Sequence, residues 1–125
     1  MPATWTISEL SREFDITPRT IRFYEDQGIV SPSRDGRNRV YSPRDRTRLK
    51  LTLRGKRLGL PLSEIRTLID MYDSPADNAL QLRQYLSVLT AHRAALEQQR
   101  RDIDDTLSEI AEQEHQCQLL LAQQS

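Results

Sequence analysis

The sequence predicts an all-α protein with a small β-hairpin wing: a winged helix-turn-helix head followed by a long C-terminal helix that forms an antiparallel coiled-coil dimer. Three observations predict this class. Helix-capping residues recur through the first half of the chain, an Asp-Gly turn separates two short extended segments, and residues 79–124 contain no Gly or Pro. We therefore expect a head over residues 1–73 and a dimerisation helix over residues 79–124, with the segment DSPADN as the boundary.

Two short helices are expected at the start, over about residues 7–14 and 18–27. The apolar stripe of the first is Ile7, Leu10 and Phe14. Thr6 and Glu9 form a capping box at the start of the first helix. The second helix has Thr17 as its N-cap, Pro18 in its first turn and Gly28 at its end. Because only a tight turn separates them, the two helices form a helix-turn-helix unit.

The second helix has two different sides. At ~100° per residue, Ile21 and Tyr24 lie on one side, where they can pack on the first helix. Arg19 and Arg22 lie on the opposite side, with Phe23 beside them. An outward pair of arginines near the front of such a helix is typical of a recognition helix that contacts guanine edges or phosphates in a major groove. Phe23 can contact a thymine methyl group or the sugar backbone, or it can pack against a neighbouring element.

A hairpin follows the second helix. Asp35-Gly36 is a dipeptide that favours a tight β-turn. In the arm that follows, Arg37, Arg39 and Tyr41 alternate and are expected on one face. Such a hairpin after a recognition helix is a wing, and it is expected to contact phosphates or the minor groove.

Two further helices complete the head. A third helix is expected to run to about Leu58, where Gly59 closes it. Its start is marked by Ser42 as N-cap, followed by Pro43 and Asp45. The basic residues in its last turn are Arg54, Lys56 and Arg57. Cations there favour the helix dipole, which explains them without DNA, and a second phosphate-contacting wing is the alternative. A fourth helix starts after Pro61, with the apolar stripe Ile65, Leu68, Ile69 and Tyr72.

The rear helix carries a heptad repeat. One row is apolar throughout and consists of Leu82, Leu89, Leu96, Ile103, Ile110 and Cys117; the other consists of Leu86, Arg93, Arg100, Leu107, Glu114 and Leu121. In a parallel pair, each charged residue of the second row would meet its own copy. In an antiparallel pair it meets an apolar residue of the first row, along which its aliphatic stem can lie. An antiparallel homodimer centred near Arg101 and Asp102 is therefore expected, and it would hold two heads apart as the half-sites of a palindrome require.

Charge and composition narrow the function. Between Arg19 and Arg57 the chain has 12 Lys and Arg against four Asp and Glu, although its formal net charge is zero, so the head is expected to meet a polyanion. The single cysteine, Cys117, excludes an intramolecular disulfide and is expected to act as a small packed hydrophobe. We find no candidate catalytic set, metal site or cofactor site, and so expect no enzyme. Without a signal peptide or an apolar run of membrane length, the expected location is the cytoplasm.

The stretch TISELSREFDITPRTIRFYEDQGIVSPSRDGRNRVYSPRDRTRLKLTLRGKRLGLPLSEI resembles the DNA-binding domain of the mercury-resistance-regulator (MerR) family of bacterial transcription factors. The family pattern T-x-R-x-I-R-F/Y-Y-E-x-x-G, a wing ending R-x-Y and a second wing ending L-G are met over residues 5–72. The run YSPRDRTRLKLTLRGKRLG further resembles the Liu branch, which controls genes of branched-chain amino acid and acyl-CoA catabolism.

The resemblance implies a dimer that binds an inverted repeat in double-stranded promoter DNA, between −35 and −10 elements with an overlong spacer, and that distorts the DNA so that RNA polymerase can engage. The residues then expected at DNA are Thr17, Arg19, Thr20, Arg22, Phe23, Arg37, Arg39, Tyr41 and Arg57. Metal sensors of the family carry a cysteine at the start of the dimer helix, where this chain has Asn78 and Ala79, so metal sensing is disfavoured.

Two alternatives to an activator stay open. The protein can act as a simple repressor that occludes a promoter. It can also be a coiled-coil interaction module whose basic head is a non-specific surface. A non-specific polyanion binder shows steep salt dependence without sequence preference, which separates the last alternative from a regulator.

Overall fold

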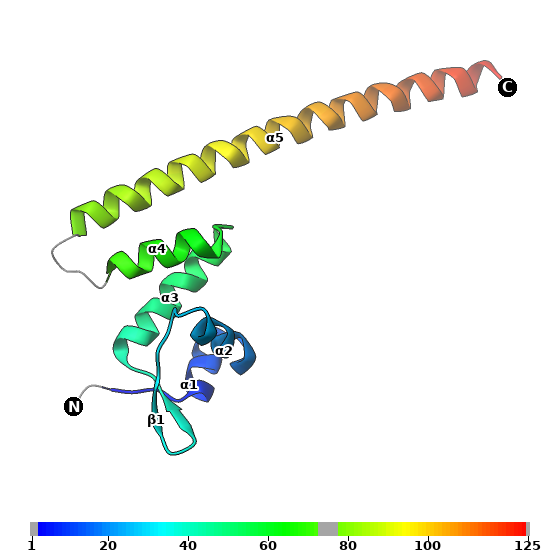
Figure 1. Cartoon of the computed structure of the whole chain (residues 1–125). Coiled ribbons are helices and arrows are strands. Elements are labelled where there is room, and N and C mark those ends of the chain that lie inside the picture. Colours follow the sequence, from blue (N-terminus) through cyan, green and yellow to red (C-terminus); the bar gives the residue numbers. More distant parts are fainter. Residues whose placement is uncertain (1–2, 73–77, 125) are drawn as a thin grey trace. The chain divides into compact units, whose positions relative to one another are not determined.

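The computed structural model describes residues 3–72 and 78–124 (Figure 1). In chain order the elements are α1 (Ile7–Phe14), α2 (Pro18–Asp26), β1 (Ser33–Asp35), β2 (Asn38–Val40), α3 (Pro43–Arg57), α4 (Leu62–Tyr72) and α5 (Asn78–Gln123). This mostly helical chain with a two-stranded hairpin and a long last helix confirms the predicted fold class. The pairing of that helix with a second copy stays a prediction, and residues 73–77 of the expected boundary lie outside the described residues.

The first two helices begin as their capping residues predict. The Thr6 hydroxyl accepts a hydrogen bond from the Glu9 amide at 3.1 Å, and a Glu9 carboxylate oxygen accepts one from the Thr6 amide at 2.9 Å. At the next helix, the Thr17 hydroxyl accepts a hydrogen bond from the Thr20 amide at 3.1 Å. These bonds satisfy amide groups that a helix start otherwise leaves unpaired, so short helices can form at defined positions.

Helix α2 ends in a Schellman cap. Gly28 has φ +78°, and its amide donates to the Glu25 carbonyl at 3.0 Å, while the Ile29 amide donates to the Tyr24 carbonyl at 2.9 Å. The left-handed conformation of this cap favours glycine. Chain direction therefore changes sharply at Gly28, and the carbonyl groups of Gly28 and Ile29 turn toward the core, where they accept hydrogen bonds from Arg48.

The hairpin is short and is extended at its base by the N-terminal segment. Strands β1 and β2 pair antiparallel, with Arg34 opposite Arg39, and the turn contains Gly36 at φ +63°. Directly after β2, Tyr41 and Trp5 exchange backbone hydrogen bonds of 3.0 and 2.9 Å. No sequence pattern indicated this bridge, because its two partners lie far apart in the chain.

Asp45 caps the start of α3 and also holds the loop that follows α2. One carboxylate oxygen accepts a hydrogen bond from the Ser42 amide at 3.0 Å, and the Asp45 amide donates to the Ser42 hydroxyl at 3.1 Å. The other carboxylate oxygen accepts a hydrogen bond from the Ser31 amide at 2.9 Å. The side chain is buried, and these bonds satisfy the carboxylate inside the fold.

Helices α3 and α4 pack closely where α3 has a glycine. A Cβ atom on Gly55 would lie 2.8 Å from Cγ1 and 2.9 Å from Cδ1 of Ile65, so the absence of a side chain permits the contact. The apolar core of the head consists of Leu10, Ile21, Tyr24, Ile29, Val30, Tyr41, Leu49, Leu60, Ile65, Leu68 and Ile69. All four helices of the head contribute to it, and they fix the position of α2.

Helix α5 runs without a break over 46 residues, which at ~1.5 Å per residue is about 70 Å. Along it, apolar side chains of both heptad rows are exposed in the single chain, among them Leu86 at 64%, Leu107 at 59% and Ile103 at 60%. A helix this long is stable in water when such a stripe packs on something. Across residues 3–72 and 78–124, no helix has the length and apolar character needed to cross a membrane.

Candidate nucleic-acid interface

The outer face of α2 carries the two arginines that the sequence singles out. Ile21 and Tyr24 are buried, and Arg19 and Arg22 are exposed on the other side of the helix. Phe23 lies next to them with 48% of its surface exposed, its ring centroid 5.6 Å from that of Tyr24. We call Arg19, Arg22 and Phe23 the α2 outer face. The two exposed guanidinium groups of this face are available to bind a phosphate or a guanine edge.

The two threonines at the start of α2 are engaged with each other. The Thr17 hydroxyl caps the helix, and it lies 3.0 Å from the Thr20 hydroxyl. Thr17 is exposed and Thr20 is half-buried. The N-terminus of α2 therefore lies at the surface beside Arg19, and the Thr17 hydroxyl occupies the Thr20 amide there.

Glu25 connects the hairpin to α2. The Arg39 Nε atom donates to the Glu25 carboxylate at 2.8 Å, and Arg34 lies 3.9 Å from the same carboxylate. The Arg39 side chain is only 24% exposed. Its contact indicates that Arg39 orients the wing relative to α2. Arg37, in the turn, is exposed and is available to a phosphate.

Tyr41 does not lie on an exposed face with Arg37 and Arg39, so that part of the sequence interpretation is wrong. Its side chain is fully buried in the core of the head, on the side of the hairpin where Arg39 meets Glu25. The hydroxyl is buried and has no hydrogen-bond partner among the described residues. Burial, with the nearby Glu25 carboxylate, raises the pKa of Tyr41 above its ordinary value.

Tyr41→Phe is expected to leave DNA affinity unchanged and to leave the head equally or more stable. The change removes only a buried hydroxyl that is unpaired in the fold, and removing such a group is favourable when nothing is left unsatisfied. Fluorescence anisotropy on an operator duplex and thermal unfolding measure the two effects. A several-fold loss of affinity at unchanged stability would restore Tyr41 to the DNA interface.

Arg46 belongs to a contact between α1 and α3. Its guanidinium forms an ion pair with Glu13 and lies 5.4 Å from the ring centroid of Trp5 and 5.9 Å from that of Phe14. The hydrogen bonds from Arg46 hold the pKa of the Glu13 carboxyl below its ordinary value. This arginine therefore joins three segments of the head and contributes little free charge to the surface.

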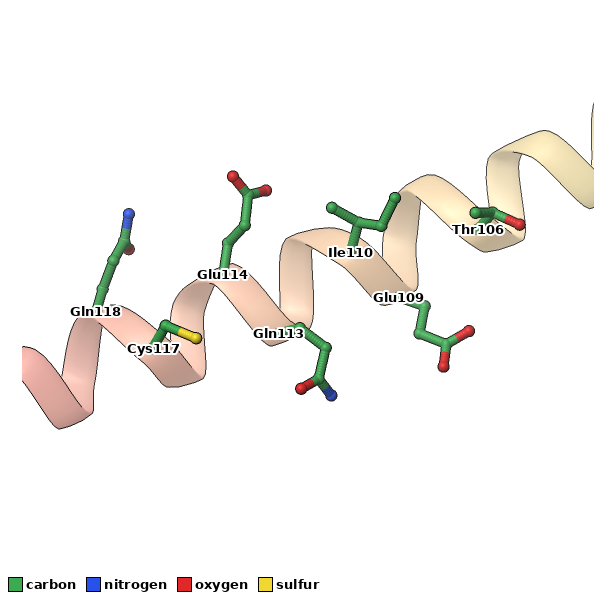
Figure 2. A pocket seen from close by; sticks show the side chains of 7 residues that line it. All are labelled: Thr106, Glu109, Ile110, Gln113, Glu114, Cys117 and Gln118. Atoms are coloured by element: carbon green, nitrogen blue, oxygen red, sulfur yellow. The ribbon is translucent and has the colours of Figure 1, made fainter.

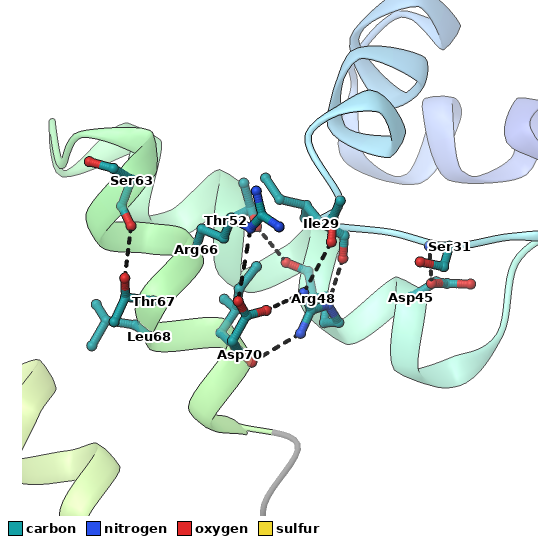
Figure 3. A network of polar contacts seen from close by, with 12 residues as sticks. Ile29, Ser31, Asp45, Arg48, Thr52, Ser63, Arg66, Thr67, Leu68 and Asp70 are labelled. Atoms are coloured by element: carbon teal, nitrogen blue, oxygen red, sulfur yellow. Dashed lines mark hydrogen bonds and ion pairs between the residues drawn. The ribbon is translucent and has the colours of Figure 1, made fainter.

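Arg48 is a basic residue that the structure places in the core (Figure 3). Its side chain is 2% exposed, and its Nε atom donates to the Ile29 carbonyl at 2.5 Å. Nη1 donates to the Ile69 carbonyl at 3.1 Å. Nη2 donates to the Asp70 carboxylate at 2.8 Å and to the Gly28 carbonyl at 3.4 Å. One guanidinium thus joins the end of α2 to the end of α4.

Sequence reasoning missed this role because it counted Arg48 among the basic surface residues. A signal was present: the buried stripe of α3 consists of Asp45, Arg48, Leu49, Thr52 and Gly55, at helical spacing. Arg48 lies on the same side as Leu49. The structure therefore removes Arg48, and largely Arg39 and Arg46, from the positive surface, whose exposed basic residues lie on α2, the hairpin and α3.

The end of α3 presents the residues expected for a second wing. Arg54, Lys56 and Arg57 are all exposed in its last turn. The turn is closed by a Schellman cap in which Gly59 has φ +83° and the Leu60 amide donates to the Gly55 carbonyl at 3.1 Å. Both explanations of these cations, the helix dipole and a phosphate contact, are compatible with this position.

Comparison with known proteins decides the family. A family profile described as "MerR HTH family regulatory protein" matches residues 5–72, more than half of the chain. The chain belongs to the MerR family. A second profile, "MerR, DNA binding", matches residues 46–113. The members of this family are transcriptional regulators and not enzymes.

Individual MerR-family proteins resemble the chain over different lengths. The regulator HmrR of Rhizobium leguminosarum bv. viciae is 35% identical over 68 residues, 54% of this chain and 53% of HmrR. The chain thus spans about half the length of curated relatives such as HmrR. The lead(II) complex of PbrR691 from Ralstonia metallidurans CH34 has a TM-score of 0.69 at 26% identity, over 85% of this chain and 81% of that one. HiNmlR, which lacks a sensor domain and is bound to promoter DNA, shares the fold at a TM-score of 0.60 and 21% identity, over 82% and 80% of the two chains.

The rear helix of this MerR-family chain has its cysteine on the apolar row. Cys117 is exposed in the single chain and lies one heptad after Ile110 (Figure 2). Residues between Thr106 and Gln118 line a shallow groove along this side of α5. Within residues 3–72 and 78–124, no three His, Cys, Asp or Glu side chains gather as metal ligands would.

Proposed function

We propose that the chain is a sequence-specific DNA-binding transcriptional regulator that acts as an antiparallel homodimer on an inverted repeat in double-stranded promoter DNA. The observation that carries the proposal is the α2 outer face. Arg19 and Arg22 are exposed opposite the buried Ile21 and Tyr24 on a helix capped at both ends. Membership of the MerR family supports the same function. A promoter regulator of this kind acts in the cytoplasm of a bacterium.

The exposed groups have different tasks. Arginine forks match guanine edges in a major groove, so Arg19 and Arg22 supply sequence preference. Arg37 at the hairpin and Arg57 at the end of α3 supply phosphate contacts, which add affinity and salt dependence. Arg39 acts indirectly, because its bond to Glu25 holds the hairpin against α2.

Arg19→Ala is expected to reduce the preference for the operator over random duplex by roughly 5- to 150-fold, the equivalent of ~1–3 kcal/mol for one base contact. Arg37→Ala is expected to weaken binding to both duplexes alike and to lower the salt slope by about 1. Anisotropy titrations at several salt concentrations measure both. Equal losses on both duplexes for both variants would contradict the assignments of helix and wing.

The second copy is proposed to pair with α5 along its whole length. When the antiparallel pair is centred between Arg101 and Asp102, every residue of one heptad row faces a residue of the partner's other heptad row. Shifting one helix by a heptad leaves fewer residues of the two rows facing each other. Arg100 then faces the partner's Ile103, and Leu107 faces the partner's Leu96. Three like-charge contacts of a parallel pair are avoided, because Arg93, Arg100 and Glu114 all face apolar side chains.

The native cysteine tests this orientation. In the proposed pair Cys117 faces the partner's Leu86, so the two Cys117 residues lie roughly 45 Å apart at ~1.5 Å per residue. Mild oxidation is therefore expected to leave the wild type without a covalent dimer, whereas Leu86→Cys cross-links to the partner's Cys117. Leu96→Cys is the matched control and is expected not to cross-link. Non-reducing gels report all three, and a ready disulfide in the wild type would establish a parallel pair instead.

The regulatory mode is proposed to be activation by distortion of the DNA between the −35 and −10 elements, in which RNA polymerase engages the realigned promoter. Host genomic fragments that the purified chain captures are sequenced to identify the DNA site. In vitro transcription from a captured promoter then shows whether the protein activates or represses it. An inverted repeat inside an overlong spacer supports the proposal. Inhibited transcription would identify a repressor, and fragments without a shared motif would favour a coiled-coil module with a non-specific basic surface.

The regulated genes are a narrower hypothesis. The resemblance to the Liu branch depends on residues 41–59, and in this fold several of those residues have structural tasks. Tyr41 is buried, Asp45 caps α3, Arg48 joins two helices, and Gly55 permits the contact with Ile65. Because folding explains the identities of these residues, they do not by themselves indicate the regulated genes. The hypothesis of branched-chain amino acid or acyl-CoA catabolism is tested by the genes that lie beside the captured fragments.

A further inference from the structure

We infer that Asp70 is a positioning residue for DNA recognition: it holds Arg48, and Arg48 holds the end of α2, so that the α2 outer face keeps its orientation. The inference depends on the proposed function for its consequence at DNA. Its structural part, the control of the end of α2 by a carboxylate on α4, can be measured without DNA.

The first observation is a continuous set of bonds between α4 and the end of α2. The Asp70 carboxylate accepts a hydrogen bond from Arg48 at 2.8 Å. The same guanidinium donates to the carbonyl of Ile29 (Figure 3) and to that of Gly28, and these two residues close α2. Because Gly28 and Ile29 also form the Schellman cap, a shift of Arg48 acts directly on the geometry of that cap.

A second contact from α4 reaches the same place. A Cβ atom on Gly28 would lie 3.1 Å from Nη2 of Arg66, which shows how closely the Arg66 side chain approaches the end of α2. Arg66 lies 3.9 Å from the Asp70 carboxylate, one helical turn away. Asp70 therefore lies near both arginines that face the end of α2, and its hydrogen bond is to Arg48.

The exposure of Asp70 explains why it can be altered without creating a cavity in the core. Arg48 is 2% exposed, whereas Asp70 is 54% exposed and fills no internal space. Asp70→Asn keeps the shape and an acceptor but removes the countercharge of a buried guanidinium. An uncompensated charge in the core favours movement toward solvent, and that movement loosens the bonds to Gly28 and Ile29.

The expected consequence differs between specific and random DNA. Arg22 lies six residues before Gly28, so a change at the cap alters the direction of a side chain about 9 Å along the helix, at ~1.5 Å per residue. Bidentate contacts to a base tolerate little misorientation, whereas phosphate contacts from the hairpin and α3 do not use this orientation. Loss of Asp70 is thus expected to reduce sequence preference more than overall affinity.

The test compares Asp70→Asn with Glu64→Gln in the full-length chain. Glu64 is an exposed carboxylate in the first turn of the same helix and lies outside this network, so it is a matched control. Hydrogen exchange of the Gly28 and Ile29 amides is measured without DNA, at a temperature where circular dichroism shows both variants folded. Affinities for the captured operator and for a random duplex follow. For Asp70→Asn we expect about tenfold faster exchange and about tenfold weaker operator binding, with random binding within twofold; Glu64→Gln is expected to match the wild type.

Each outcome bears on one of the two proposals. Unchanged exchange at Gly28 and Ile29 would overturn the inference whatever happens at DNA. Faster exchange with unaltered operator affinity, or with equal losses on both duplexes, would overturn the positioning role. A wild type without any sequence preference would refute the proposed function, and the exchange measurement would still decide whether Asp70 controls the end of α2.

Discussion

Arg48→Ala is expected to lower the free energy of unfolding by roughly 2–6 kcal/mol, because two buried carbonyl groups lose their donor at ~1–3 kcal/mol each. The Ile29 and Ile69 carbonyls lose their donor inside the fold, and Asp70 loses its partner. A domain is stable by only ~5–15 kcal/mol, so this single change removes a large share of the total. Chemical denaturation followed by circular dichroism measures it.

Arg54→Ala is the matched control, because Arg54 lies on the same helix but is exposed in its last turn. Its removal is expected to change stability by no more than about 0.5 kcal/mol, as for surface substitutions in general. If Arg48→Ala cost no more than Arg54→Ala, the buried network would not contribute to stability. Its carbonyl groups would then have to find other donors.

Leu107→Glu is expected to dissociate the proposed dimer and to weaken operator binding by ~100-fold or more, the contribution of linking two half-site contacts. The change places a carboxylate against the partner's Leu96, and it does so twice because the pair is symmetric. An unpaired charge cannot be buried in an apolar seam at acceptable cost. Sedimentation analysis measures the mass, and anisotropy on operator duplexes measures the affinity.

Leu119→Glu is the control for this prediction. Leu119 is also an exposed leucine of α5, but it belongs to neither heptad row and faces solvent in the proposed pair. It is expected to leave both mass and affinity unchanged. A dimer that survived Leu107→Glu but not Leu119→Glu would show that another face of α5 forms the contact.

The helix ends were predictable because short-range chemistry decides them. Thr6 with Glu9, Thr17 with Thr20, and Ser42 with Asp45 each satisfy amides only a few residues away, and the glycines at the ends of α2 and α3 supply the left-handed conformation. These bonds depend on local spacing alone. The predicted starts of the first three helices therefore agree with the structure, and the exposed side of α2 follows from helical periodicity.

The hairpin shows where local reasoning fails. Alternation predicted that Arg37, Arg39 and Tyr41 share an exposed face, yet Tyr41 is buried and Arg39 is engaged by Glu25. Arg39 and Tyr41 both lie near Glu25 of α2, so this side of the hairpin is turned toward the fold. No window around Tyr41 contains Glu25, so the inward direction of this side could not be read from the pattern.

By itself, the sequence determined the class of the fold, the capped helices, the outward arginines of α2 and the heptad rows of α5, because each depends on neighbours within a few turns of chain. Only the tertiary structure decided which of the other arginines leave the surface: Arg48 closes the core, and Arg39 holds the hairpin. A guanidinium can serve in either place, and its partners Glu25 and Asp70 are brought to it by folding from 14 and 22 residues away.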